Sequence, residues 1–144
     1  MGVLGLMTAR SVLAQNAAGN AGGFVCVEER SVQPFVVKGF LAHDNCVNDL
    51  VIRQVETKAG RIDKTIWEQS AHDVSIDPEA AAVSEIWKNS MAFRVKDKGD
   101  VADAVLFLPQ AMHDNDPQTV TRSRLKIKMK TGKAYDLRLH CART

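Results

Sequence analysis

Residues 121–130, Thr-Arg-Ser-Arg-Leu-Lys-Ile-Lys-Met-Lys, alternate strictly between uncharged and cationic side chains. Successive side chains of a β-strand point to opposite faces, so this period of two predicts a strand with one buried face and one basic face. Like charges in a row repel one another, which favours an anionic partner, unless the cations only protect an exposed strand edge. The predicted buried residues are Ser123, Leu125, Ile127 and Met129, and the predicted basic residues are Arg122, Arg124, Lys126, Lys128 and Lys130.

The segment that follows continues the pattern and predicts a β-hairpin. Its apolar residues again stand at odd numbers (135, 137, 139 and 141), so the two arms share a buried face only if the loop holds an odd number of residues. A three-residue loop over 130–132 places Gly132 where a positive φ is required. The charge then concentrates at the end of the hairpin away from Gly132, where we expect a bound anion. This register sets Lys126 opposite Asp136, Arg124 opposite Arg138, and Arg122 opposite His140.

Charge is distributed unevenly along the chain. The 144 residues include 19 Lys and Arg and 17 Asp and Glu, for a net charge of +2. Eight of these cations but only one of the acids, Asp136, lie between Arg122 and Thr144. Such asymmetry indicates an interaction surface, or else an acidic body that folds over the basic segment and neutralises it. The sequence leaves both explanations open.

The rest of the chain predicts a mainly β fold in one domain over 24–144. Short runs rich in Val, Ile and Phe, separated by turn residues, indicate an antiparallel β-sandwich or a strongly bent sheet of about seven or eight strands. One α-helix is predicted over 77–88, because Asp77 is a good N-cap and Pro78 suits the first helical position. The apolar run 101–108 is compatible with either a buried strand or a short helix.

Residues 1–23 predict export followed by a flexible N-terminus. An apolar run over 2–7 precedes Val12 and Ala14, which suit the positions before a signal-peptidase cleavage site, and Gln15 would begin the mature chain. The alternative is an amphipathic first helix over 3–18. No segment has the 18–20 apolar residues of a membrane span, so we expect none. The signal-peptide pattern predicts a periplasmic or secreted protein.

The three cysteines are compatible with export. Cys26, Cys46 and Cys141 have no Cys-x-x-Cys spacing, which argues against a zinc-ribbon or thioredoxin-like motif. In an oxidising compartment two of them would pair, and three pairings are possible. Linking Cys141 to either of the others would fasten the C-terminus to the early part of the fold. Three reduced thiols in a cytosolic protein are the alternative.

Signs of catalysis or of metal binding are weak. The sequence has no Gly-x-Ser-x-Gly elbow and no glycine-rich phosphate loop. His-Asp pairs occur in predicted loops, where both residue types are common, and none has the helical spacing of a zinc motif. We therefore expect a protein that is not an enzyme and uses no metal or cofactor. The loop residues kept as alternative sites are His43, Asp44, His113, Asp114 and Asp116.

The segment Ala42 to Cys46, Ala-His-Asp-Asn-Cys, resembles the short Cys/His/Asp loop with which periplasmic lysozyme inhibitors of the Ivy family block their target. That loop has a cysteine at each end, whereas this segment has only Cys46, with Asn45 beside it. The resemblance covers about five residues. It implies an inhibitor that occludes an enzyme through a loop.

Three functional hypotheses follow. The first is an exported binding protein whose basic sheet face, including Arg138 and His140, binds an anionic protein, glycan or lipid. The second is a periplasmic inhibitor or immunity-type protein that plugs a partner enzyme through a loop over 43–46 or 112–117. The third, nucleic-acid binding, requires a cytosolic protein, and Tyr135 would point away from the basic face, which therefore lacks interleaved aromatic residues. The sequence does not indicate an oligomeric state.

Overall fold

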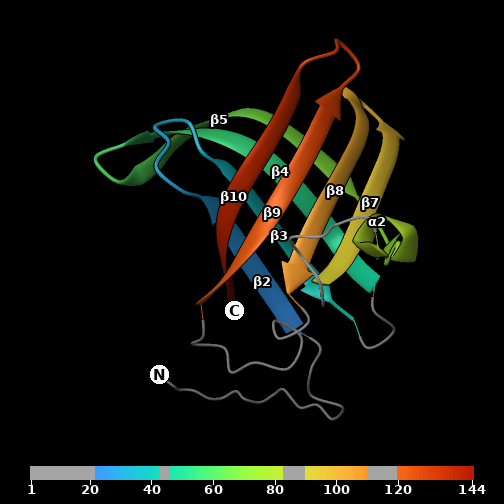
Figure 1. Ribbon diagram of the computed structural model, residues 1–144. Coiled ribbons are helices and arrows are strands. Elements are labelled where there is room, and N and C mark those ends of the chain that lie inside the picture. Colours follow the sequence, from blue (N-terminus) through green and yellow to red (C-terminus); the bar gives the residue numbers. More distant parts are fainter. Residues whose placement is uncertain (1–21, 43–45, 83–89, 110–119) are drawn as a thin grey trace.

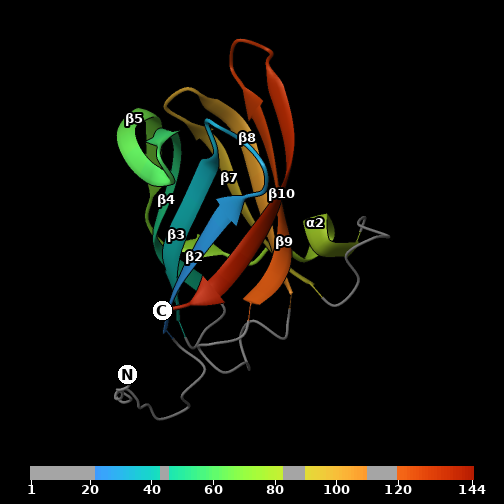
Figure 2. The ribbon, with the colours of Figure 1, turned by 90° about the vertical axis from the view of Figure 1, so that its left-hand side faces the viewer.

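The computed structural model describes residues 22–42, 46–82, 90–109 and 120–144. Eight of the strands follow one another in the order β5-β4-β3-β2-β10-β9-β8-β7 in a single antiparallel sheet, which curls into a half-barrel (Figure 1, Figure 2). These strands are β2 (Gly22–Glu28), β3 (Phe35–Leu41), β4 (Cys46–Lys58), β5 (Arg61–Ala71), β7 (Ser90–Lys98), β8 (Val101–Pro109), β9 (Val120–Met129) and β10 (Ala134–Arg143).

The expected mainly β fold is confirmed, in the form of a bent sheet rather than a sandwich. A short strand, β6 (Val74–Ser75), pairs with β4. The next residue, Ile76, forms an isolated bridge with Phe93 of β7. The chain after β5 therefore connects one side of the sheet to the opposite edge strand, which supports its curled shape.

The apolar core lies on the inner face of the curled sheet. In β9, Ser123, Leu125 and Ile127 are at most 1 % exposed, as the alternation along this strand predicts. Side chains from every long strand contribute to the same cluster, because each presents alternate residues to the inner face. Its largest fully buried members are Phe24, Phe93, Leu41, Leu50, Met91, Leu106, Leu108, Leu125, Ile127, Leu139 and Val37.

Strand β8 is buried on both faces, which explains why its sequence does not alternate between apolar and polar residues. Leu106 and Leu108 belong to the inner core, whereas Val105 and Phe107 form a second cluster with Ala80 and Ala92. A strand covered on both sides has no reason to alternate between apolar and polar residues. The run 101–108 is therefore a strand, although its pattern alone was equally compatible with a helix.

The helix that covers this outer cluster is α2 (Pro78–Ala82). The Asp77 carboxylate accepts hydrogen bonds from the backbone N–H groups of Glu79 (3.1 Å) and Ala80 (3.3 Å), so the predicted N-cap is confirmed. The remainder of the helix predicted over 77–88 falls on residues 83–89, outside the described residues. Within the described ranges, no helix has the length and apolarity that spanning a bilayer requires.

The β9–β10 hairpin has the predicted register. Lys126 lies opposite Asp136, and Arg124 opposite Arg138. The Met129 N–H donates to the Lys133 carbonyl at 2.8 Å, which leaves a three-residue loop over 130–132. Gly132 in that loop has a φ of +98°, the conformation for which glycine was expected.

A disulfide fastens this hairpin to the start of the fold. β10 pairs with β2 so that Cys141 lies directly opposite Cys26, and the two sulfurs are bonded. Both cysteines are fully buried, and the Ser123 hydroxyl lies 3.1 Å from the sulfur of Cys141. Of the three pairings that the sequence left open, the structure has the one that joins the C-terminal strand to β2.

Candidate anion-binding site

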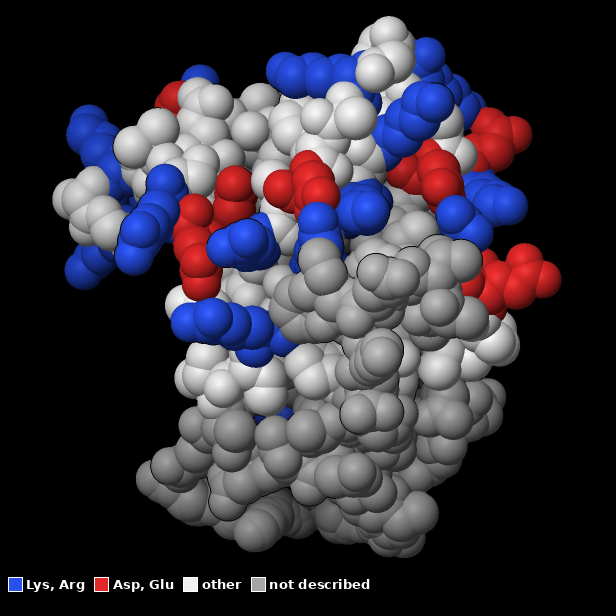
Figure 3. Space-filling model, in the orientation of Figure 1, with Lys and Arg blue, Asp and Glu red and all other residues white. Residues whose placement is uncertain are grey.

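The predicted basic residues lie on the outer face of the half-barrel, opposite the core. Arg122, Arg124, Lys126 and Lys128 alternate along β9 with the buried residues Ser123, Leu125 and Ile127. In Figure 3, Lys and Arg side chains gather over the upper part of this face, with Asp and Glu side chains among them. The strand therefore presents a row of cations, as predicted, but acidic side chains lie among the cations of this face.

Pairing of the strands turns this row into a block. Arg124 lies opposite Arg138, and Arg122 lies opposite His140, so four cationic or potentially cationic side chains occupy adjacent positions on two strands. β2 lies on the other side of β10, and the Glu29 N–H donates to the Arg138 carbonyl at 3.2 Å. The end of β2 therefore lies beside the block.

A cavity of about 400 Å³ opens at this block. Its cationic lining comes from Arg122 and Arg124 on β9, from Arg138 on β10, and from Arg30 in the turn after β2. Glu29 supplies a carboxylate, and Ser123 and Leu139 complete the lining. The cavity lies at the end of the hairpin away from Gly132, where the sequence placed the anion site. Arg30 and Glu29 are the members that the sequence did not predict.

Arg124 is held in place by an acid on the neighbouring strand. Its Nε and Nη2 donate to the two carboxylate oxygens of Asp136 at 2.7 and 2.5 Å. These hydrogen bonds lower the pKa of Asp136 and raise that of Arg124. Asp136 lies opposite Lys126, so it was expected to pair with that residue. The guanidinium of Arg124 reaches diagonally instead, because its planar fork matches both oxygens.

Two other predicted residues have acidic partners. His140 contacts the Glu29 carboxylate, an ion pair whenever the imidazole is protonated. Lys130 lies 2.7 Å from Asp97 in the turn between β7 and β8, and this hydrogen bond lowers the pKa of Asp97. Acids of the body therefore neutralise part of the basic hairpin. The residues without an ion pair to any described residue are Arg122, Lys126, Lys128 and Arg138.

A second hollow of about 410 Å³ lies on the same face, nearer the hairpin tip. Lys126 and Lys128 line it together with Val105 and Phe107 of β8. Both apolar residues are only 6 % exposed, and Ala80 of α2 and Ala134 of β10 also line the hollow.

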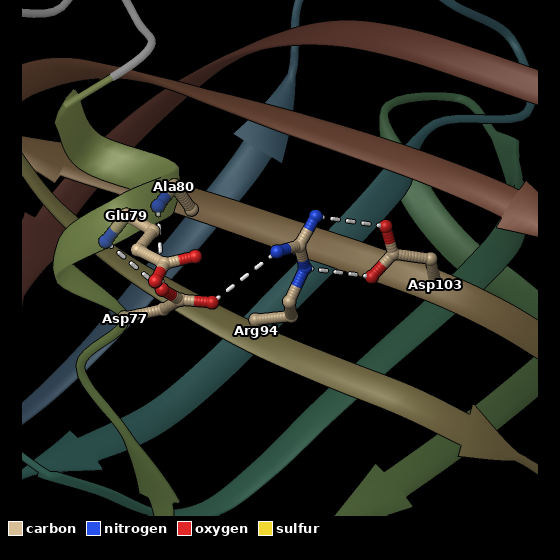
Figure 4. Close-up of polar contacts among 5 residues, drawn as sticks. All are labelled: Asp77, Glu79, Ala80, Arg94 and Asp103. Carbon is tan, nitrogen blue, oxygen red and sulfur yellow. Dashed lines mark hydrogen bonds and ion pairs between the residues drawn. The ribbon is translucent and has the colours of Figure 1, made fainter.

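Arg94, at the border of the second hollow, is committed to a structural network (Figure 4). Its Nε and Nη2 donate to Asp103 at 3.0 and 3.1 Å, and its Nη1 donates to Asp77 at 3.3 Å. The hydrogen bonds to Asp103 raise the pKa of Arg94. The network joins the N-cap of α2 to β7 and β8. Arg94 therefore holds the fold together here and contributes little free positive charge.

The chemistry that the arginine-lined cavity offers is recognition of an anion. Each guanidinium presents planar, permanently charged donors that match carboxylate, phosphate and sulfate oxygens. In the part of the chain that the structure describes, no three His, Cys, Asp or Glu side chains gather to hold a metal ion. The alternative loop residues His43, Asp44, His113, Asp114 and Asp116 lie outside the described residues, as does most of the segment 42–46. The hypothesis of occlusion through a loop therefore stays a prediction.

The two residues missed by sequence reasoning come from a distant part of the chain. Glu29 and Arg30 reach the cavity only because β2 pairs with β10, and nothing in the local pattern of either strand specifies that pairing. The cysteines carried the missing signal. If Cys26 is set opposite Cys141, continuing the antiparallel register brings Glu29 beside Arg138.

Comparison with known proteins adds no family to this description. No protein-family model matches the chain, and no curated protein or solved structure does so either.

Proposed function

We propose that the protein binds an anionic partner through the outer face of β9 and β10 and performs no chemistry on it. The observation that carries this proposal is the convergence of four arginines, from β9, β10 and the turn after β2, around one cavity. Glu29 is the one acid among the described residues of its lining. A block of like charges on adjacent strands costs stability. Asp136 and Glu29 offset the repulsion at Arg124 and His140, and a bound anion would offset it at Arg122 and Arg138, which form no ion pair with a described residue.

The position of β9 in the sheet argues against edge protection as the reason for its cations. β9 pairs with β8 on one side and with β10 on the other, and β10 in turn pairs with β2. The edges of the sheet are β5 and β7. Cations on a strand with both neighbours in place do not prevent edge-to-edge pairing.

Two observations favour a protein, glycan or lipid outside the cytosol over a nucleic acid. The buried Cys26–Cys141 disulfide is of the kind that persists in oxidising compartments, which supports an exported protein. The ring of Tyr135 contacts that of Phe35, with centroids 5.0 Å apart and planes tilted by 57°; Phe35 belongs to the inner cluster and Tyr135 packs against it. Tyr135 therefore provides no stacking platform for bases on the basic face.

The test compares two double variants that remove the same charge. Arg122→Gln with Arg138→Gln removes two of the four arginines of the cavity, whereas Lys58→Gln with Arg61→Gln removes two cations at the tip of the β4–β5 hairpin, neither of which is among the described residues that line the cavity. Heparin, vesicles of phosphatidylglycerol, and an acidic protein such as α-lactalbumin serve as probes, at low and at high salt.

We expect at least one probe to bind the wild type, to weaken steeply with salt, and to lose most of its affinity in the cavity variant only. Affinities for every probe that do not change with salt would overturn the proposal. Equal losses in the two variants would also overturn it. Binding that survives neutralisation but is lost when residues 112–117 are replaced by a short glycine-serine linker would favour occlusion through a loop instead.

A further inference from the structure

The two kinds of cation are segregated along the hairpin. Among the described residues, every cation that lines the cavity is an arginine: Arg30, Arg122, Arg124 and Arg138. The lysines occupy the other end, with Lys126 and Lys128 on β9 and Lys130 and Lys133 at the turn. If only positive charge were required, the two residue types would be interchangeable along the whole face.

Arginine and lysine bind anions differently. A guanidinium presents a rigid planar fork that makes two parallel hydrogen bonds to one oxyanion, whereas an ammonium is a compact, strongly hydrated point charge. Arginines around a concave site therefore favour an anion of defined shape. Lysines on an open strand provide long-range attraction that is insensitive to shape.

From this segregation we infer that the arginine-lined cavity is a selective site for a single tetrahedral oxyanion, a phosphate or sulfate ester carried by the partner, whose three terminal oxygens can accept hydrogen bonds from two guanidinium forks at once. This inference rests on the function proposed above and adds the group that is recognised. Lys126, Lys128, Lys130 and Lys133 contribute attraction to the partner without selecting the group.

The arginines of the cavity differ in how many hydrogen-bond donors they keep for a ligand. Arg124 already uses Nε and Nη2 for Asp136, so it keeps only part of its donor set for a ligand. Arg122 and Arg138 are exposed and form no ion pair with any described residue, so their forks are available. They lie diagonally across the block, on β9 and β10, and both line the cavity. These two side chains are expected to supply the paired hydrogen bonds.

The size of the cavity sets the scale of the ligand. Its volume of about 400 Å³ corresponds to roughly a dozen water molecules. That is more room than an oxyanion alone requires, and it falls in the range of small-ligand sites. The group recognised is therefore expected to include an oxyanion together with a neighbouring unit of about the size of a sugar ring.

The test uses sugars that differ only in the charged group. Glucose 6-phosphate, glucose 6-sulfate, glucuronate and uncharged glucose are titrated into the wild type, and binding is followed by calorimetry. We expect the phosphate or the sulfate to bind and glucuronate to bind at least about tenfold more weakly, because a carboxylate has only two oxygens to share between the two forks, with no binding of glucose. The first two arms also distinguish a phosphorylated from a sulfated partner. Glucuronate binding as tightly as both esters would overturn the inference.

Charge-conserving variants separate selective recognition from simple attraction. Arg122→Lys with Arg138→Lys keeps the net charge, yet it should lower the affinity for the bound ester by about tenfold, because the forks are lost. The matched control, Lys126→Arg with Lys128→Arg, should change that affinity by less than twofold. Both pairs are exposed, so circular dichroism spectra should match the wild type.

The possible failures are distinguishable. Suppose that both charge-conserving double variants bind the ester like the wild type, while Arg122→Gln with Arg138→Gln loses heparin or vesicle binding. The selective site is then disproved, and the proposed function stands. If the Gln variant retains all binding, both fail.

Discussion

The Cys26–Cys141 disulfide should supply a large part of the stability of the fold. It joins residues 115 apart in the sequence. In the chain-entropy model, closing a loop of this length in the unfolded chain contributes about 5 kcal/mol, and native disulfides of small domains contribute about 2–5 kcal/mol. Total stabilities of domains are about 5–15 kcal/mol. We expect the double variant Cys26→Ala with Cys141→Ala to lose about 3–5 kcal/mol in urea unfolding.

Removing the bridge also affects a buried polar group beside it. The Ser123 hydroxyl lies 3.1 Å from the Cys141 sulfur and 4.0 Å from the Cys26 sulfur, so the double variant takes both of these neighbours away. For a chain of this size, the expected loss corresponds to a fall of about 10–15 °C in Tm. Because both cysteines are 0 % exposed, dithiothreitol should not reduce the wild-type bond until the protein unfolds.

The control for the disulfide is Cys46→Ala, which lies outside the bridge and should cost much less. A double variant whose free energy of unfolding stays within about 1 kcal/mol of the wild type would refute the reasoning. Rapid reduction of the bond in the folded protein would show that β2 and β10 separate easily, contrary to the burial of the two sulfurs.

Three further predictions concern packing and pH, all measured by urea unfolding. Leu125→Ala, in the centre of the core, should cost about 2–5 kcal/mol. Gly39→Ala should cost about 1–3 kcal/mol, because the new methyl carbon would lie 2.7 Å from a methyl of Val47; an unchanged stability would show that β3 and β4 adjust freely. The Ala80 N–H and Arg94 lower the pKa of Asp77 from 3.8, so ionised Asp77 stabilises the fold above about pH 4, and this contribution disappears as pH falls through the lowered pKa. The deficit of Asp77→Asn at pH 7 should therefore shrink as pH falls below 3.8 and vanish once pH has passed the lowered pKa of Asp77, and a deficit independent of pH would contradict this.

The hairpin shows how far the sequence alone can lead. Strict alternation over 121–130 fixes which residues of β9 are buried, and the odd-numbered apolar residues of β10 then determine the register and the loop. Leu125, Ile127 and Leu139 are buried as that reasoning requires, and Gly132 has the positive φ. These features depend on local geometry, which a period of two specifies well.

Features that depend on distant strands could not be predicted in the same way. The pairing of β2 with β10 brings together segments more than a hundred residues apart, and it adds Arg30 and Glu29 to the cavity. Asp136 pairs with Arg124 although it lies opposite Lys126, because side-chain reach and guanidinium geometry decide this contact rather than the register. The run 101–108 hides its strand character because α2 covers its outer face.

The central claim is that the arginine-lined cavity on β9 and β10 is the binding site for an anionic partner. The most direct test is to titrate the ¹⁵N-labelled protein with a short heparin oligosaccharide, and with glucose 6-phosphate, while recording the Nε–Hε resonances of its arginines. The resonances of Arg122 and Arg138 should shift most and saturate together, while those of Arg61 and Arg94 stay in place. Largest shifts at Arg61, or at amides of residues 43–45 and 110–119 with Arg122 and Arg138 unmoved, would contradict the claim.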